Sequence, residues 1–298
     1  MERLLHRSAF AVTSEVVPPR SADPEAVRRQ ARELVGCADA VNITDNPAAS
    51  AHMSALAGAA LVARAGLEPV VQVTTRDRNR LALTADLLGA WALGARSVLC
   101  LTGDPPSVGD HPDARSSGDL SVLDLIGLVA RLRDRAELLS GATIEHPPRY
   151  FIGVADSPLA DPYDIGRLEA KADAGADFVQ TQIVFDVDAF AEWADLARSR
   201  GVFERMFVLA GVAVPRSAQS ARYMRDHLPG VRVPDALIRA LEDAAPADER
   251  LSVTLIADVV ARLRAVAGVA GIHLMGLGRL EPIRQVVEAA GLFPRPAV

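Results

Sequence analysis

Residues 10–20, FAVTSEVVPPR, are the stretch of this sequence that decides the fold. The branched and aromatic residues in this stretch are typical of a β-strand. The pair Pro18–Pro19 ends the strand, because proline cannot donate a hydrogen bond to a β-ladder. Glu15 therefore lies at the carboxyl end of the first predicted strand. A carboxylate in that position is typical of chemistry at the mouth of a barrel of parallel strands. A solvated charge at a strand end is the alternative interpretation.

Seven further apolar runs follow, and amphipathic helical patterns alternate with them along the chain. The eight predicted strands cover residues 10–16, 40–44, 69–74, 97–101, 150–155, 178–185, 206–214 and 271–277. The predicted helices cover residues 24–35, 51–65, 79–93, 120–132, 164–174, 187–199 and 280–290. Their apolar residues recur three and four positions apart, as do Leu81, Ala85, Leu88 and Ala92.

This alternation of continuous apolar strands with helices indicates parallel pairing with both faces of the sheet covered. Eight such units in 298 residues fit a (β/α)8 TIM barrel. The other candidate fold is an open doubly wound sheet. That fold often has a glycine-rich turn after its first strand, where this chain has two prolines.

Two regions interrupt the alternation. Residues 104–117 are polar and rich in proline and glycine, so we expect a long loop on the face where barrel active sites lie. Residues 224–250 predict extra helices after the seventh strand, with breaks at Pro234 and Pro246. The sequence shows no internal repeat, and we expect residues 1–298 to form a single domain.

Composition and charge narrow the class of protein. A net charge of −6 disfavours a nucleic-acid binder, which is usually basic, and 4% aromatic residues provide few stacking platforms. No apolar run is long enough to span a membrane, and the amino terminus lacks the apolar core of a signal peptide, so we expect a cytoplasmic protein. Cys37 and Cys100 show no metal-ligand spacing, and we expect no metal site.

Lys171 is the only lysine among 32 basic residues. An ammonium is a compact charge on a flexible stem, whereas a guanidinium is a flat fork. We therefore expect Lys171 to have a role that an arginine could not fill. The alternative is that a single lysine remains in the sequence by chance.

Polar residues follow most of the predicted strands and would meet at one mouth of a closed barrel. They are Glu15, Thr44, Asp45, Gln72, Thr74, Thr75, Thr102, Asp104, Asp156, Gln180, Gln182 and Arg279. Glutamines inside a barrel need hydrogen-bond partners. Gln180 and Gln182 therefore predict a ligand with amide-like donors and acceptors, and a self-satisfied polar plug is the alternative.

Five short motifs in this order resemble the methylenetetrahydrofolate reductase family over nearly the whole chain. They are Glu15 with VVPP after it, Gly103-Asp104-Pro105, Lys171 with ADAGA after it, Thr181-Gln182 with Phe185-Asp186, and Leu277-Gly278-Arg279. The resemblance implies that Glu15 is the acid that assists opening of the imidazolidine ring of 5,10-methylenetetrahydrofolate. It implies that Asp104 binds the pterin ring and that Gln182 hydrogen-bonds folate. Glu15 and Asp104 are thus the predicted catalytic residues, and the predicted substrate-binding residues are Gln182, Gln180, Leu277 and Arg279.

The family's flavin contacts are only partly present in this chain. The positions that the resemblance assigns to cofactor binding are Thr44, Gln72, Thr102, Asp164 and Lys171. The family usually has histidine where this chain has Gln72, arginine where it has Thr102, and a basic residue where it has Ala170. Fewer positive charges weaken the binding of a pyrophosphate.

The resemblance therefore points most closely to a flavin-independent, mycobacterial-type branch of the family. We expect NADH to transfer hydride directly to folate in a ternary complex, with FAD absent. A conventional FAD-dependent reductase is the first alternative. A folate-binding barrel without redox activity and a folate-dependent methyltransferase are the others.

Overall fold

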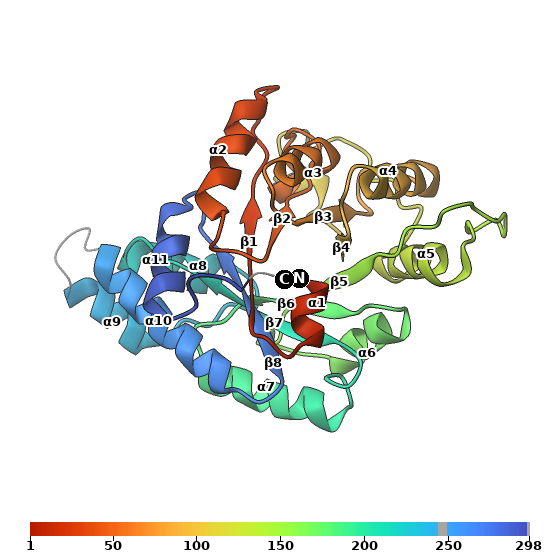
Figure 1. Cartoon of the computed structure of the whole chain (residues 1–298). Helices are drawn as coiled ribbons and strands as arrows, with labels where there is room; N and C mark the ends of the chain where they lie inside the picture. Colours follow the sequence, from red (N-terminus) through yellow and green to blue (C-terminus); the bar gives the residue numbers. More distant parts are fainter. Residues whose placement is uncertain (244–248, 297–298) are drawn as a thin grey trace.

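The computed structural model describes residues 1–243 and 249–296. Its strands form a closed parallel barrel in which each strand pairs with the next and β8 pairs with β1 (Figure 1). The strands are β1 (Ala11–Val16), β2 (Ala40–Ile43), β3 (Pro69–Thr74), β4 (Ser97–Leu101), β5 (Phe151–Asp156), β6 (Phe178–Ile183), β7 (Phe207–Ala213) and β8 (Val269–Met275). The predicted TIM barrel is confirmed.

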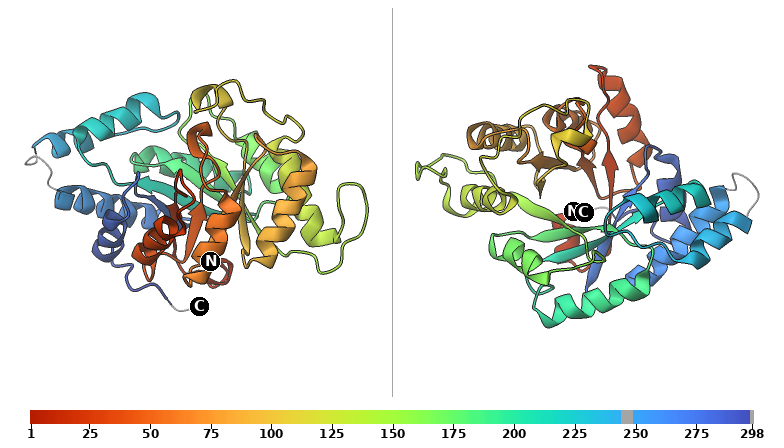
Figure 2. Two further views of the ribbon diagram at one scale, coloured as in Figure 1. Left: turned by 90° about the horizontal axis from the view of Figure 1, so that it is seen from above. Right: turned by 180° about the vertical axis from the view of Figure 1, so that it is seen from behind.

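Helices surround the barrel on all sides (Figure 2). They are α2 (Pro24–Leu34), α3 (Ala55–Arg64), α4 (Arg80–Ala92), α5 (Val122–Arg135), α6 (Ile165–Asp173), α7 (Val187–Ser199), α8 (Ala218–His227), α9 (Asp235–Asp243), α10 (Glu249–Ala265) and α11 (Glu281–Ala289). The extra helices after the seventh strand are α8 and α9. The predicted break at Pro246 lies outside the described residues.

Two short 3-10 turns and one short helix complete the fold. The turn η1 (Pro47–Ala49) follows β2, and η2 (Pro106–Val108) lies in the predicted loop after β4. The helix α1 (Glu2–His6), which is not among the predicted helices, closes the amino-terminal end of the barrel. Its residues Leu4 and Leu5 are buried in one apolar cluster with inward residues of seven strands, β1 to β7.

The register fixes which side chains point into the barrel. Ala11, Ala40, Val70, Leu99, Phe151, Phe178 and Leu209 belong to the inner apolar cluster. Successive residues of a strand alternate between its two faces, so Thr13 and Glu15 on β1 also point inward. The residues between them face the helices and belong to the larger outer core, as Val12 and Val16 do.

The described part of the chain gives two further negative findings. None of its helices combines the length and the apolar character that a bilayer crossing requires. Its His, Cys, Asp and Glu side chains do not gather in groups of three or more that could hold a metal ion.

Gly153 makes room for an aromatic ring inside the barrel. A Cβ at this position would lie 2.2 Å from Cζ of Phe178, whose ring stacks on Phe151 with centroids 4.9 Å apart. Both rings are fully or almost fully buried. Glycine is therefore required at this position because of the close approach.

We predict that Gly153→Ala lowers the free energy of unfolding by about 2 kcal/mol, because overpacking strains the rings. Gly127→Ala is the matched control: Gly127 lies inside α5 with no atom within 4 Å of an added Cβ. Alanine in a helix interior should raise stability by about 0.7 kcal/mol. Urea unfolding of both variants measures this, and equal shifts in the two variants would contradict the packing argument.

Candidate active site at the carboxyl ends of the strands

Glu15 points toward the barrel axis from the end of β1 and is only partly exposed. Burial raises the pKa of its carboxyl from 4.5 to about 7, and no ion pair contributes to this shift. A carboxyl with that pKa is protonated in about half of the molecules at neutral pH. Glu15 can therefore act as a general acid under ordinary conditions.

A hollow of about 300 Å³ lies between the end of β1, α2 and the turn from β8 to α11. Glu15 and Arg279 both line it, so the structure brings these two predicted site residues together. The turn is tight: a Cβ at Gly276 would lie 1.7 Å from the carbonyl oxygen of Arg279. Leu277 adopts a positive φ of 51° in this turn and is 41% exposed at the rim.

A layer of polar side chains crosses the barrel below Glu15. Asn42 donates from Nδ2 to Oε1 of Gln180 at 2.6 Å, and Gln180 donates from Nε2 to Oγ1 of Thr13 at 3.3 Å. Thr13 is also 3.0 Å from Nδ1 of His273. Burial lowers the pKa of His273 to about 4, so the imidazole is neutral at neutral pH.

This layer corrects one prediction. Gln180 is 4% exposed and its amide is satisfied by Asn42 and Thr13, so it belongs to the polar plug that was the alternative interpretation. Sequence reasoning missed Thr13, Asn42 and His273. The signal was available, because all three occupy inward positions of their strands in the predicted alternation.

Gln182 lies beside an irregularity in the pairing of β6 with β7. The register shifts between Gln180 and Ile183, and Gly211 donates its backbone N–H to Oγ1 of Thr181 at 2.9 Å. The amide of Gln182 accepts from the backbone of Ile183 at 2.9 Å and donates to the carbonyl of Pro229 at 3.4 Å. Gln182 is on the same strand face as Phe178 and Gln180, so it lies above Gln180 toward the mouth of the barrel.

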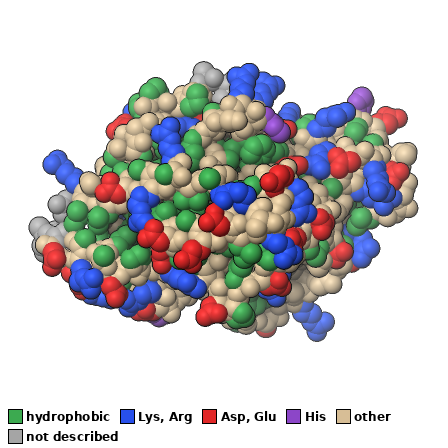
Figure 3. Space-filling model, turned by 90° about the horizontal axis from the view of Figure 1, so that it is seen from below, with side chains coloured by type: hydrophobic (Ala, Val, Ile, Leu, Met, Phe, Trp, Pro, Cys, Tyr) green, Lys and Arg blue, Asp and Glu red, His purple; other side chains and the backbone are tan. Residues whose placement is uncertain are grey.

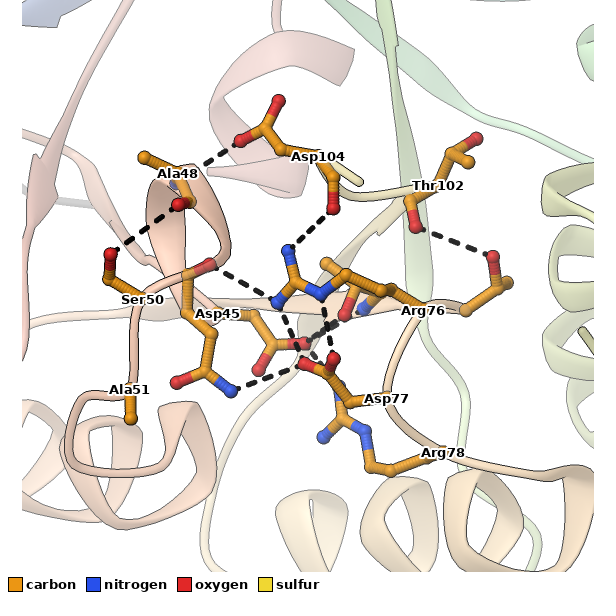
Figure 4. Close-up of polar contacts among 12 residues, drawn as sticks. Asp45, Ala48, Ser50, Ala51, Arg76, Asp77, Arg78, Thr102 and Asp104 are labelled. Atoms are coloured by element: carbon orange, nitrogen blue, oxygen red, sulfur yellow. Dashed lines mark hydrogen bonds and ion pairs between the residues drawn. The ribbon is translucent and has the colours of Figure 1, made fainter. Parts of the chain in front are cut away.

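Asp104 lies on the loop after β4 and is exposed (Figure 4). Its carboxylate accepts a hydrogen bond from the backbone N–H of Ala48 at 3.1 Å, and its carbonyl accepts from Nη1 of Arg76 at 3.2 Å. Further along the loop, the carboxylate of Asp110 pairs with Arg20 at 2.7 Å. The loop after β4 is thus held against the loops that follow β1, β2 and β3.

The carboxylate of Asp45 makes contacts that stabilise the fold, and it does not face the mouth of the barrel. It accepts from the backbone N–H of Thr74 at 2.8 Å and from its hydroxyl at 3.0 Å, and it pairs with Arg78. These contacts join the end of β2 to the end of β3. Beside them, Arg76 is buried and pairs with Asp77 at 2.7 Å (Figure 4).

Two of the five predicted cofactor residues point into the mouth. Thr44, just after β2, and Gln72 on β3 continue the inward faces of their strands, which Ala40 and Val70 begin. The hydroxyl of Thr44 is buried and has no hydrogen-bond partner among the described residues. A buried hydroxyl without a partner is costly, so Thr44 is suited to contact a ligand.

The other three predicted cofactor residues have different surroundings. Lys171 on α6 donates to the carbonyl of Ala155 at 2.6 Å and lies 3.7 Å from Asp156. Burial lowers the pKa of Lys171, and Asp156 opposes that shift. Asp164 accepts from the backbone of Gly166 at 3.0 Å and caps α6. Thr102 is exposed at the end of β4.

Comparisons with known proteins agree with this picture. A family model described as "Methylenetetrahydrofolate reductase" matches residues 1–291. "Methylenetetrahydrofolate reductase 1" of Schizosaccharomyces pombe is 26% identical over 237 residues, which are 76% of this chain and 36% of that protein. "Probable methylenetetrahydrofolate reductase (NADPH)" of Caenorhabditis elegans is 24% identical over 310 residues, covering 98% of this chain and 44% of that protein. The chain thus spans less than half the length of these two relatives.

A bacterial relative is closer in length. "5,10-methylenetetrahydrofolate reductase" of Salmonella typhimurium is 25% identical over 234 residues, which cover 78% of this chain and 73% of that protein. A solved structure described as "Uncharacterized protein from Clostridium thermocellum binds two copies of 5-methyl-5,6,7,8-tetrahydrofolic acid" is similar in fold. The TM-score is 0.62 at 12% identity, with 97% of this chain and 96% of that chain covered.

We predict that Glu15→Gln removes a pH-dependent loss of stability. The pKa of Glu15 is raised in the folded state. The contribution of its side chain to the free energy of unfolding is therefore fully present below pH 4.5 and is lost as pH rises through about 7. Glutamine does not ionise, so above pH 8 the free energy of unfolding of the variant should exceed that of wild type by about 3 kcal/mol. Urea unfolding from pH 4 to pH 9 tests this, with exposed Glu192→Gln on α7 as control. A constant difference between variant and wild type would contradict it.

Proposed function

Because the chain belongs to the methylenetetrahydrofolate reductase family, we propose that it reduces 5,10-methylenetetrahydrofolate to 5-methyltetrahydrofolate, with a reduced nicotinamide nucleotide as the source of hydride. The observation that carries the proposal is Glu15, a carboxyl with a pKa of about 7 at the barrel mouth. The fold neighbour described as binding 5-methyltetrahydrofolate adds support for a folate ligand in a barrel of this kind.

In the proposed reaction Glu15 supplies the proton and the nicotinamide supplies the hydride. The proton goes to the ring nitrogen that leaves the bridging methylene carbon, and the carbon–nitrogen bond breaks. The resulting iminium carbon accepts the hydride, which gives the methyl group. The raised pKa of Glu15 suits this role, because the acid is still protonated near neutral pH.

We propose that Asp104, Gln182, Leu277 and Arg279 contact the folate. Asp104 is exposed, and its carboxylate accepts a hydrogen bond from the backbone N–H of Ala48 at 3.1 Å. Gln182 has its longest contact, 3.4 Å, to the carbonyl of Pro229. A pterin edge presents donors and acceptors that can replace both interactions. Arg279 lines the same hollow as Glu15, and Leu277 lies at its rim.

We further propose that hydride passes directly from NADH, without bound flavin. Two observations support this route. Lys171 is neutralised by Asp156 and bonded to the carbonyl of Ala155, so it is poorly placed to hold a pyrophosphate. Thr102 stands where the family usually has arginine and brings no charge. These residues do not fit a flavin diphosphate well. The unpartnered hydroxyl of Thr44 and the amide of Gln72 suit a neutral ring, which a nicotinamide provides.

The proposal predicts the spectrum and the cofactor requirement of the purified protein. We expect no flavin absorbance in the visible blue region. Under anaerobic conditions, NADH should be consumed when methylenetetrahydrofolate is added, and added FAD should not raise the rate. A stoichiometric flavin band, or a rate that depends on FAD, would support the conventional flavoenzyme. Folate binding without NADH consumption would point to a non-redox barrel or a methyltransferase, which a methyl-transfer assay separates.

We predict that Glu15→Gln lowers kcat by about a hundredfold, because the amide keeps the shape but cannot supply a proton. In wild type, kcat/KM should fall as pH rises through about 7, since Glu15 then loses its proton. The variant should lack that fall, and Glu192→Gln should match wild type. Steady-state kinetics from pH 5.5 to pH 9 provide the test. Near-normal turnover of Glu15→Gln would remove Glu15 from the acid role.

A further inference from the structure

The outer face of α4 is apolar. Leu81, Ala85, Leu88 and Ala92 are all exposed, and Leu81 is 78% exposed. These are the residues whose spacing indicates an amphipathic helix in the sequence, yet the structure buries a second set, Leu83, Leu87 and Ala90, against the barrel. The helix is therefore apolar on both sides, which is unusual for a helix that faces water.

The α4 side of the barrel also carries little charge. Of the 13 residues of α4, only Arg80 and Asp86 are charged. Arg80 pairs with Asp119 at 2.7 Å, and Asp86 pairs with Arg78 at 2.9 Å. By contrast, α7 carries four charged residues in the same length. Figure 3 views the molecule from the side that bears α7 and α10, and there acidic and basic side chains are interspersed. The uncharged stripe on α4 is thus a local feature.

The order of large and small residues in the stripe on α4 is complementary to the same order read in the opposite chain direction. Its residues follow one another at intervals of four, three and four, in the order Leu, Ala, Leu, Ala. In an antiparallel pair of α4 helices centred between residues 86 and 87, Leu81 of one chain meets Ala92 of the other. Leu88 then meets Ala85. Each large side chain faces a small one, which is what close packing of two helices requires.

We propose that α4 pairs antiparallel with α4 of a second copy of this chain, across a two-fold axis between residues 86 and 87. A two-fold interface needs a patch in which residue i contacts j and j contacts i, and this stripe has that property. A copy is favoured over an unrelated partner because the match lies within the stripe itself. The absence of charge on the stripe also means that two copies do not repel one another.

The size of the contact sets its strength. A helix of 13 residues is about 20 Å long. Next to it, Ala57 on α3 and Leu93 after α4 are exposed and extend the apolar surface. A single pair of helices of this length makes a small contact beside the roughly 1,000 Å² of a specific interface, so we expect the dimer to dissociate at micromolar concentrations. Because α4 lies on the side of the barrel, pairing leaves the mouth open and activity unchanged.

Sedimentation equilibrium tests the proposal. At about 100 µM, well above a micromolar dissociation constant, wild type should have twice the chain mass of 31.6 kDa. Ala85→Glu places a charge in the stripe at an exposed site of a helix and should reduce the mass to one chain. Leu88→Glu should have the same effect, and Leu196→Glu on α7 is its matched control, because Leu88 is 37% exposed and Leu196 is 42% exposed. A monomeric wild type, or a dimer that Ala85→Glu does not disrupt, overturns the proposal.

Cysteine cross-linking tests the register. Residues 81 and 92 are about 16 Å apart along one helix, too far for a disulfide within the chain. The double variant Leu81→Cys/Ala92→Cys should form an oxidised dimer on a non-reducing gel, and neither single variant should. Cys37 and Cys100 are buried and should not react. Equal cross-linking in a single variant would show that the helices do not meet in this register.

Discussion

The hydrogen bond between Asn42 and Gln180 joins β2 to β6 across the interior of the barrel, and the rest of the candidate site depends on it. With Thr13 and His273, these amides separate an apolar lower interior from the polar mouth. Buried amides are stable only when their donors and acceptors are satisfied, so the layer also fixes the spacing of the strands that meet there. Glu15 lies one inward position above Thr13, over groups that offer dipoles but no charge. That arrangement explains why burial alone sets the pKa of its carboxyl.

Much of this fold could be predicted from the sequence, because it depends on local patterns. Each predicted strand overlaps an observed one, since continuous apolar runs between helical repeats suit only a parallel sheet with both faces covered. Features that depend on contacts between distant residues could not be predicted. The bulge beside Gln182 arises from pairing with β7, and a Cβ at Gly211 would lie 2.2 Å from the carbonyl oxygen of Thr181. The role of Gln180 depends on Asn42, which is 138 positions away. The apolar spacing on α4 predicted the helix but could not show which set of residues faces the barrel.

The single lysine, Lys171, uses its charge in contacts within the protein. Lys171 reaches from α6 to the carbonyl of Ala155 and the carboxylate of Asp156, and Tyr163 donates to the same carboxylate at 2.9 Å. A compact ammonium fits this enclosed space, whereas a planar guanidinium needs room for five donors. The contact joins α6 to β5, and Asp164 caps the same helix. Both residues thus stabilise the scaffold, whichever ligand the mouth accepts.

In the proposed reaction, Glu15 serves two steps in succession, and among the described residues no cation contributes to its pKa shift. A neighbouring cation would lower its pKa and leave no proton to donate. Burial has the opposite effect and keeps the acid available near neutral pH. Once the proton has moved to the departing nitrogen, Glu15 is an anion in a site of low polarity, beside the iminium that it helped to form. Charges of opposite sign attract strongly in such surroundings, so the carboxylate stabilises the cation until hydride neutralises it. A glutamine would keep the hydrogen-bonding capacity of the site and lose both the acid and the counter-ion.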